Sequence, residues 1–298
     1  MPTKSSLILT STEVPPRVSG WRRFGRVFLS RAIVIFGAVI IVVFVITAIF
    51  APFLTPHDPL KTNLSQALLQ PSLRHPLGTD ANGRDLFSRI IAGSRIALMV
   101  GVVSVAIGSV IGMAMGLVAG YFGGSAFIII MRFTDALMSL PPLLVALIIT
   151  ALLGSGLINI MIAIGISMIP PPCRIMCGQV LSVKEQDFIL AERSIGSSDF
   201  RILLRHVFPN CLSPLIVQTT MQLGFAILAE ASLSFLGIGI ALPAPAWGGM
   251  VNDGRQFLAT HPIISVAPGF AIMLVVFAFN MVGDGLRDAL DPRLRGIL

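Results

Sequence analysis

The chain has 298 residues, of which 55% are apolar and only 12% are charged, and its mean hydropathy is +0.89. Soluble domains carry about 25% charged residues, so this composition excludes a water-soluble protein with a single buried core. The net charge of +7 would suit nucleic acid in a soluble protein, but two Trp and one Tyr offer almost no aromatic surface for stacking bases. The sequence therefore predicts an all-α polytopic membrane protein that binds no nucleic acid.

The first apolar segment covers residues 32–54 without a charge and follows four closely spaced arginines. It is long enough to cross a bilayer, which takes about 20 residues, and it exceeds the roughly 7–15 apolar residues of a signal peptide. We interpret it as a retained signal anchor. Residues 1–31 then form a cytoplasmic tail, and residues 55–95 form an extracytoplasmic loop.

Five further crossings are expected within residues 96–283, and a cytoplasmic tail of residues 284–298 follows them. Glycine, proline or charged positions separate these crossings. The segment 170–172 is Pro-Pro-Pro and must distort or end the fourth helix, because proline has no N–H group to donate. The expected ranges of the five helices are about 96–120, 136–153, 157–173, 212–237 and 263–282.

Six crossings place both termini on the same side of the membrane, and the distribution of cations predicts which side. With the N-terminus in the cytoplasm, the inward segments carry 15 of the 21 Lys and Arg residues. All the loops are short enough for the positive-inside rule to apply. We therefore expect both termini, and the long loop of residues 174–210, to face the cytoplasm.

Two features inside the expected helices call for an interpretation. Glu230 is an acid within the fifth helix, and an ionisable group in a membrane is a functional candidate by default. It could hold helices together, line a substrate path or take part in proton coupling, and we favour the first. A face of small residues on the second helix suits close packing, either within the chain or against another subunit. That face consists of Gly108, Gly112, Gly116 and Gly120.

The sequence offers little to suggest an enzyme. It contains no GxxxxGK[ST] phosphate loop, no HExxH and no GxSxG, so ATP hydrolysis through such a loop is excluded for this chain. The three cysteines form no metal quartet, and we interpret them as small buried thiols. The four histidines lie in loops or at membrane edges without the spacing of metal ligands, so no metal site and no catalytic residue is assigned. They are His57, His75, His206 and His261.

The cytoplasmic loop of residues 174–210 holds more ordered, half-apolar sequence than a simple connector needs. Residues 184–195 predict an amphipathic helix, with Phe188, Ala191 and Ile195 on one side. The loop therefore predicts a projection into the cytoplasm rather than a slack linker.

The end of this helix and the start of the next are also marked in the sequence. Gly196 predicts a helix stop, since glycine commonly follows the last helical residue. Ser197 or Ser198 can then cap a second helix that runs into Pro209. The resulting element is a helix-glycine-helix hairpin between two membrane helices.

This hairpin resembles the EAA loop of ABC-importer permeases, whose pattern is roughly E-A-A-x-x-x-G followed by a proline after the second helix. Leu190 stands where the acid usually lies, and Glu192 stands where the second alanine usually lies. The resemblance implies that the hairpin couples the permease to ATPase subunits. The residues that carry it are Phe188, Ala191, Glu192, Arg193, Gly196, Arg205, His206, Pro209 and Asn210.

Other segments narrow the resemblance to the C-type subunit of the dipeptide, oligopeptide and nickel permeases. Residues 75–89 read HPLGTDANGRDLFSR, and residues 230–239 read EASLSFLGIG. Residues 245–248 and 283–293 are similar to that subfamily as well. Together with the hairpin, these segments extend from about residue 32 to the C-terminus.

The resemblance implies a type I ABC-importer permease in the inner membrane, working by alternating access. Its expected partners are a second homologous permease, two ATP-binding subunits, an extracytoplasmic substrate-binding protein and membrane lipid. This chain would bind no cofactor of its own, because ATP and Mg²⁺ belong to the ATPase subunits. Peptides are the expected substrate, with nickel, glutathione or opine-like solutes as alternatives. A stand-alone secondary transporter is the alternative from another class, and a single intramembrane acid argues against it.

Overall fold

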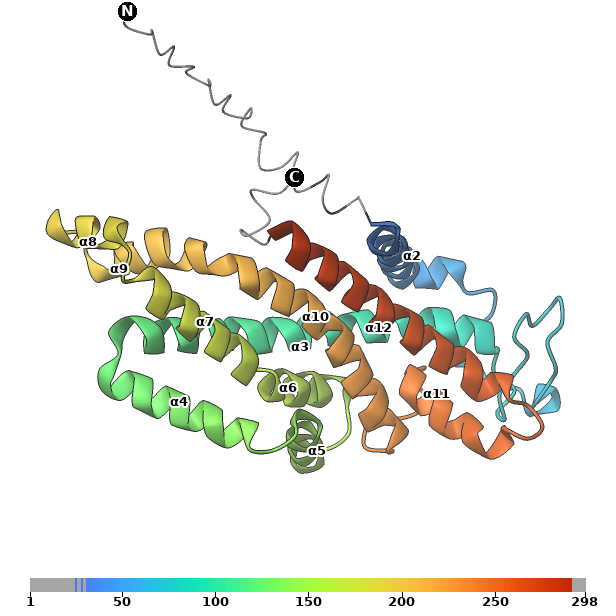
Figure 1. Ribbon diagram of the computed structural model, residues 1–298. Helices are drawn as coiled ribbons and strands as arrows, with labels where there is room; N and C mark the ends of the chain where they lie inside the picture. Colours follow the sequence, from blue (N-terminus) through green and yellow to red (C-terminus); the bar gives the residue numbers. More distant parts are fainter. Residues whose placement is uncertain (1–24, 26–27, 29–30, 291–298) are drawn as a thin grey trace, which may run out of the picture.

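The computed structural model describes residue 25, residue 28 and residues 31–290, and the regular elements within them are helices (Figure 1). Five helical segments of this part are long and apolar enough to cross a membrane, and one bent helix pair could make a sixth. The expected all-α membrane fold is confirmed. Most of the two expected tails lies outside the described residues, and the side of the membrane on which they lie stays a prediction.

Helix α2 (Ala32–Leu54) has the bounds that its apolar run predicts. Figure 1 views it nearly end-on while α12 (Ile263–Leu290) lies lengthwise, so the two helices cross at a steep angle. Phe44 of α2 packs edge-on against Phe279 of α12, with ring centroids 6.5 Å apart. Apolar packing of this kind fixes α2 on the outside of the bundle.

Helix α3 (Leu86–Phe122) begins well before residue 96, where the sequence analysis placed its start. Arg89 was taken as a loop charge, but its side chain is only 1% exposed. Its Nη1 atom donates to the backbone oxygens of Pro59 and Pro243, at 3.0 and 3.3 Å. An arginine that is paired in this way can be buried inside a helix, so the charge did not mark a helix end.

A single crossing was expected over residues 136–153, but only α5 (Pro142–Leu153) lies within that range, and α4 (Gly124–Met138) lies mostly in the preceding residues, which were expected to face the cytoplasm. The two helices meet at an angle of 90°. Pro141 and Pro142 explain the break, because proline cannot donate to the preceding turn and disfavours a helical residue before it. With 12 residues, α5 alone is about 18 Å long and cannot cross a bilayer core of about 30 Å.

Helices α6 (Leu157–Ser167) and α7 (Pro170–Val183) together form one apolar segment of 27 residues. The sequence analysis ended this crossing at residue 173, at the three prolines. Their side chains instead occupy the first turn of α7, where the missing N–H groups have no partner within the helix to lose. The helix is interrupted at Met168 and Ile169, between α6 and α7.

The hairpin of the long loop consists of α8 (Asp187–Ser194) and α9 (Asp199–Ile202). Its second helix does not end at Pro209. It continues through a π-helical turn (Leu203–Val207) into α10 (Phe208–Phe235). Pro209 lies in the first turn of α10, so the hairpin and the fifth crossing form one continuous arm.

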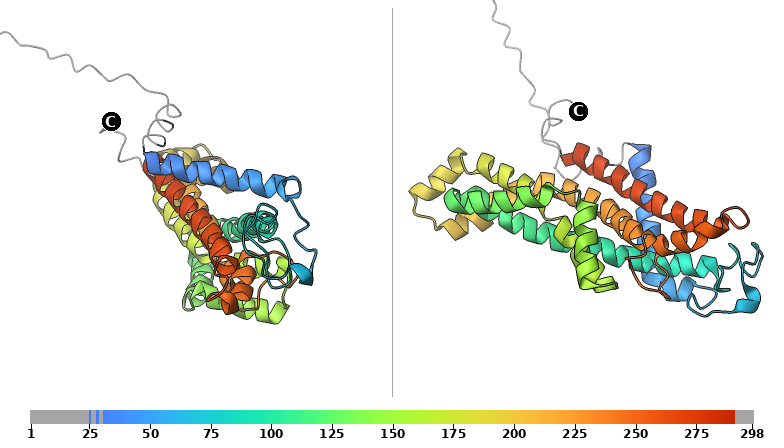
Figure 2. Two further views of the ribbon diagram at one scale, coloured as in Figure 1. Left: turned by 90° about the vertical axis from the view of Figure 1, so that its right-hand side faces the viewer. Right: turned by 90° about the horizontal axis from the view of Figure 1, so that it is seen from below.

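The last part of the chain closes the bundle at the end far from the hairpin (Figures 1 and 2). Short α11 (Trp247–Gly254) packs between α10 and α12. Trp247 donates from Nε1 to the backbone oxygen of Ile90, at 3.0 Å, and thereby ties α11 to α3. Short 3₁₀ turns at Leu64–Gln66 and Arg255–Phe257 complete this end.

The glycine face of α3 packs against α6 and α7 of the same chain. A Cβ at Gly116 would overlap the carbonyl of Cys173, and one at Gly120 would lie 2.8 Å from Cβ of Val180. Gly108 faces Gly165 and Met168 at the end of α6, and Gly112 faces Ile169 and Pro172 at the start of α7, at similarly short distances. Of the two interpretations that the sequence left open for these glycines, the structure shows close packing within the chain.

Candidate functional site

The turn between α8 and α9 has the geometry of a glycine helix stop. Gly196 has φ +78°, a left-handed conformation that residues with a Cβ rarely adopt. Its N–H group donates to the Arg193 oxygen at 3.0 Å, and the N–H of Ser197 donates to the Glu192 oxygen at 3.1 Å. These two bonds close the last turn of α8 and reverse the chain.

Glu192 links the two arms of the hairpin. Its Oε2 atom accepts a hydrogen bond of 2.6 Å from Oγ of Ser197, and its Oε1 atom lies 3.4 Å from Nε2 of His206. Ser197 follows the turn, and His206 lies in the π-helical segment before α10. Glu192 therefore fixes the angle between α8 and the arm that leads into the membrane.

Tyr121 anchors the hairpin to the end of α3. Its hydroxyl donates to Oδ1 of Asp199 at 2.6 Å, and the guanidinium of Arg193 lies 5.8 Å from its ring centroid. No pattern in the sequence singled out this residue. Its residue type could have drawn attention to it, because it is the one tyrosine of the sequence and directly follows Gly120.

The tip of the hairpin exposes apolar side chains. Leu190 is 50% exposed, Ile195 is 78% exposed and Phe200 is 72% exposed. Ile189 is the residue of α8 that is fully buried, while Phe188 and Ile195 of the expected apolar side lie at the surface. The hairpin thus has an inner face that packs on the bundle and an apolar outer face.

The other hairpin residues singled out in the sequence also lie at the surface. Ala191, Arg193, Arg205 and Pro209 are exposed. Asn210, also exposed, donates from Nδ2 to the His206 oxygen at 2.6 Å and so supports the irregular turn before α10. The structure brings all nine sequence-selected residues onto one projecting element.

A groove runs along α10 from its start to its middle. Near the start of α10 it is a cavity of about 570 Å³ between α7, α10 and α12. Farther along α10 it is a cavity of about 300 Å³ between α5, α7 and α10. Gln218 and Met221 line both cavities, so the two adjoin each other. The polar side chains along the groove are Ser167, Gln179, Asn210, Ser213, Gln218, Gln222 and Arg287.

Two glutamine side chains of this groove, Gln222 and Gln218, differ in the hydrogen bonds that they make within the protein. Gln222 accepts from Oγ of Ser109 and donates to the Met168 oxygen, both at 3.4 Å. No described residue hydrogen-bonds the side chain of Gln218. A larger hollow of about 720 Å³ beside α10, α11 and α12 is mostly apolar, which suits lipid or another helix better than a polar solute.

Glu230 lies outside the groove. It is 1% exposed, and its Oε1 atom accepts a hydrogen bond of 2.7 Å from Oγ of Ser234, one turn along α10. Ser234 Oγ in turn accepts from the backbone N–H of Ile240 at 3.3 Å. This chain of bonds ties α10 to the loop that follows it.

Comparisons with known proteins place these features in a family. A family model described as the binding-protein-dependent transport system inner membrane component matches residues 108–296. A second model, described as the N-terminal TM domain of oligopeptide transport permease C, matches residues 19–71. The two models together cover most of the chain.

Relatives that match nearly the whole chain carry permease names. The dipeptide transport system permease protein DppC of Alkalihalophilus pseudofirmus is 44% identical over 278 residues, covering 93% of this chain and 91% of the relative. The glutathione transport system permease protein GsiD of Pectobacterium atrosepticum is 41% identical over 276 residues, covering 92% of each.

One solved structure shares the fold. A chain of the inward-facing MetNI methionine ABC transporter matches with a TM-score of 0.53 and 17% identity, over 68% of this chain and 96% of that one. This chain and the solved structure therefore share an arrangement of helices. The chain therefore belongs to the family of binding-protein-dependent transport system inner-membrane components, the permeases of ABC importers.

Proposed function

We propose that this chain forms half of the path by which di- or oligopeptides cross the inner membrane, driven by ATP hydrolysis on partner subunits. A second permease would form the other half, and an extracytoplasmic binding protein would deliver the peptide. The two relatives named above, a dipeptide permease and a glutathione permease, support a peptide as the substrate.

The observation that carries the proposal is the chemistry of the groove along α10. Its polar lining is mostly neutral, with amides and hydroxyls that can both donate and accept. A peptide backbone presents the same two kinds of group, so such a lining accommodates peptides of many sequences. The free amide of Gln218, where the two cavities meet, is best placed for such a bond.

The same lining argues against nickel. Divalent nickel prefers imidazole, thiolate or carboxylate ligands, and none of the residues lining either cavity is His, Cys, Asp or Glu. Proton-coupled transport by this chain alone is disfavoured too, because Glu230 bonds Ser234 and does not reach the groove.

The hairpin supports the ATP-driven part of the proposal. An exposed apolar tip on a rigid, anchored element is suited to seat in a groove of another subunit. Movement of that partner on closing around ATP would act on α10 directly, because the hairpin continues into α10. The groove lies along the same helix, so one rigid arm joins the docking surface to the proposed path and supports alternating access.

Uptake by the reconstituted full transporter tests the proposal. Gln218→Leu is expected to lower ATP-dependent uptake of a labelled dipeptide about two- to tenfold, the equivalent of one lost hydrogen bond of about 0.5–1.5 kcal/mol. Ile216→Leu, on an exposed part of the same helix, is the matched control and should leave uptake unchanged. Uptake of labelled nickel in place of the dipeptide, or no effect of Gln218→Leu, would contradict the proposed substrate path.

A further inference from the structure

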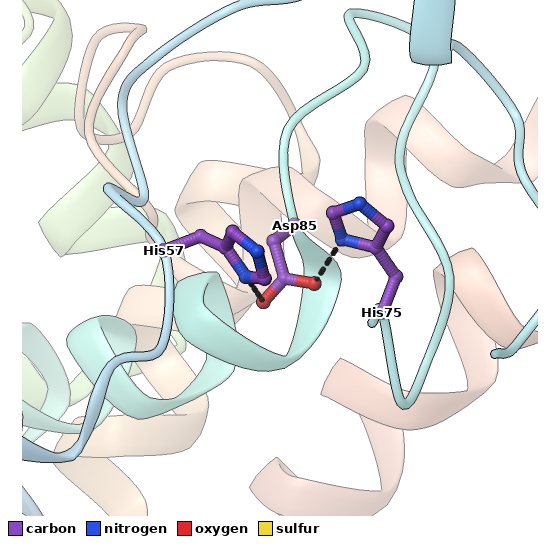
Figure 3. A group of neighbouring side chains, drawn as sticks. All are labelled: His57, His75 and Asp85. Atoms are coloured by element: carbon purple, nitrogen blue, oxygen red, sulfur yellow. Dashed lines mark hydrogen bonds and ion pairs between the residues drawn. The ribbon is translucent and has the colours of Figure 1, made fainter. Parts of the chain in front are cut away.

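Three potential metal ligands meet in the segment between α2 and α3, which the sequence analysis left without a role. His57 follows α2, His75 lies in the middle of the loop, and Asp85 is the N-cap of α3. Figure 3 shows Nδ1 of both imidazoles facing the carboxylate of Asp85. One ligand atom from each residue lies within 4.8 Å of the others. The loop thus folds back to bring together residues that are far apart in sequence.

The carboxylate is held in a fixed orientation. Asp85 is 3% exposed, and its Oδ2 atom accepts bonds of 2.8 and 2.6 Å from the backbone N–H and Oγ of Ser88. Its Oδ1 atom lies 2.9 Å from Nδ1 of His75. Asp85 is therefore a buried oxygen donor held in one orientation.

The cluster leaves nitrogen atoms unused. Nδ1 of His57 and Nε2 of His75 are buried, and neither is hydrogen-bonded to a described residue. Nδ1 of His57 points into the cluster but stops 3.8 Å from Oδ2 of Asp85, too far for a hydrogen bond. Buried ring nitrogens normally find a partner, so an unused one that points at a carboxylate indicates a missing ligand.

We propose that His57, His75 and Asp85 bind a zinc-like divalent transition metal ion. Two imidazoles and one carboxylate form a donor set that suits zinc, whereas magnesium and calcium prefer oxygen alone. Ligand atoms on a tetrahedral zinc lie about 3.3 Å apart, given bonds of about 2.0–2.1 Å. Nδ1 of His75 lies 2.9 Å from Oδ1 of Asp85 and Nδ1 of His57 lies 3.8 Å from Oδ2, so each imidazole approaches a different oxygen of the carboxylate at a distance near that value.

The surroundings suit an ion that enters from water. The side chain of His57 is 33% exposed, so its ring can adjust and water can complete the coordination. The backbone N–H of His57 donates to Oγ of Ser88 at 3.1 Å and already holds this part of the loop near α3. A bound ion would join the two ends of the loop between α2 and α3, and an ion that binds only the folded protein stabilises the fold by mass action.

Zinc binding by the purified full transporter tests the site. After removal of metal with a chelator, zinc alone is titrated against a colorimetric zinc indicator. The wild type should bind one zinc per copy of this chain at least tenfold more tightly than His57→Ala. His261→Ala removes a half-buried histidine elsewhere and is the matched control, which should bind like the wild type. Magnesium should not compete.

A second variant separates loss of ligand from loss of structure. His57→Phe keeps an aromatic ring to stack on His75, whose centroid is 4.7 Å from that of His57, but it removes the nitrogen. Zinc should raise the melting temperature of the wild type and of His261→Ala, but not that of His57→Phe. Equal zinc affinity in the wild type and His57→Ala, or no tight zinc binding by the wild type, would overturn the proposal. The experiment does not depend on peptide transport.

Discussion

Oε1 of Glu192 lies 3.4 Å from Nε2 of His206, across the glycine turn that separates the two arms of the hairpin. The same carboxylate accepts the hydroxyl of Ser197, so one side chain holds both the turn and the arm that enters the membrane. In relatives with the usual EAA pattern this position carries alanine. The hairpin of this chain therefore has a polar brace where the family pattern has a small residue.

Removing the brace should loosen the hairpin without unfolding the bundle. Glu192→Ala restores the residue type of the family pattern but deletes both interactions. Because partly exposed ion pairs contribute about 0–1 kcal/mol, we expect a fall in melting temperature of only a few degrees. Peptide-stimulated ATP hydrolysis should fall about two- to fivefold. Arg201→Ala, an exposed change on the neighbouring helix, is the control; equal activity of both variants would show that the brace has no role in coupling.

The expected topology has a direct chemical test. In a background in which the buried Cys173, Cys177 and Cys211 are replaced, a single cysteine at Ser198 should react with an impermeant reagent only after the cells are opened. A single cysteine at Leu73, which is fully exposed in the loop between α2 and α3, should react in intact cells. Labelling of position 198 from outside would contradict the orientation that was predicted from the 15 Lys and Arg residues of the inward segments.

Glu230 should matter through its hydrogen bond rather than its charge. Glu230→Gln keeps an oxygen that can accept from Ser234, so assembly and uptake should stay near those of the wild type. Glu230→Leu leaves the buried Ser234 hydroxyl without this acceptor and should lower the free energy of unfolding by about 1–3 kcal/mol. Thermal unfolding and uptake of both variants check this. Loss of uptake in Glu230→Gln, with assembly and ATP hydrolysis intact, would assign the acid to the transport cycle instead.

The contact between α3 and α7 can be tested with two glycines. In Gly116→Ala the new Cβ would overlap the carbonyl of Cys173, so the helices must separate, at a cost of about 1–3 kcal/mol or more. Gly178→Ala on α7 meets nothing within 4 Å and should be neutral or stabilise by up to about 1 kcal/mol, since alanine favours helix. The yield and melting temperature of the purified transporter should separate the two variants. Equal stability would contradict the close packing of α3 on α7.

The sequence predicted the elements whose signals are local. The bounds of α2 follow from an uninterrupted apolar run, and the left-handed turn at Gly196 follows from glycine after an amphipathic helix. The start of α3 was missed because Arg89 is paired by carbonyls of Pro59 and Pro243, which are distant in sequence. No local pattern reveals such partners.

Pro141 and Pro142 could have predicted the break between α4 and α5, but they lie within an apolar run that was interpreted as one crossing. The candidate sites divide in the same way as the helices. The hairpin residues are contiguous enough to be recognised, whereas Tyr121 acts on the hairpin from the far end of α3. The groove along α10 combines side chains of five helices, and the approach of His57 to Asp85 depends on how an irregular loop folds back. These relationships arise from tertiary packing, which spacing along the chain does not encode.

The central claim is that the hairpin transmits ATP-driven movement to a peptide path, and Gly196→Asp tests it most directly. At φ +78° any side chain adds strain of about 1 kcal/mol or more, and aspartate also places a charge beside the exposed apolar tip. Gly154→Asp, at φ +85° in the turn between α5 and α6, also places a side chain at a positive φ but away from the hairpin, and it serves as the control.

The measurement is dipeptide uptake together with peptide-stimulated ATP hydrolysis, in proteoliposomes that contain the full transporter. Gly196→Asp should reach the membrane at near-normal levels, yet lose at least tenfold in both activities and bind its ATPase subunits more weakly. Gly154→Asp should keep most of both activities. Full uptake by Gly196→Asp, with the ATPase subunits still bound, would contradict the coupling role of the hairpin.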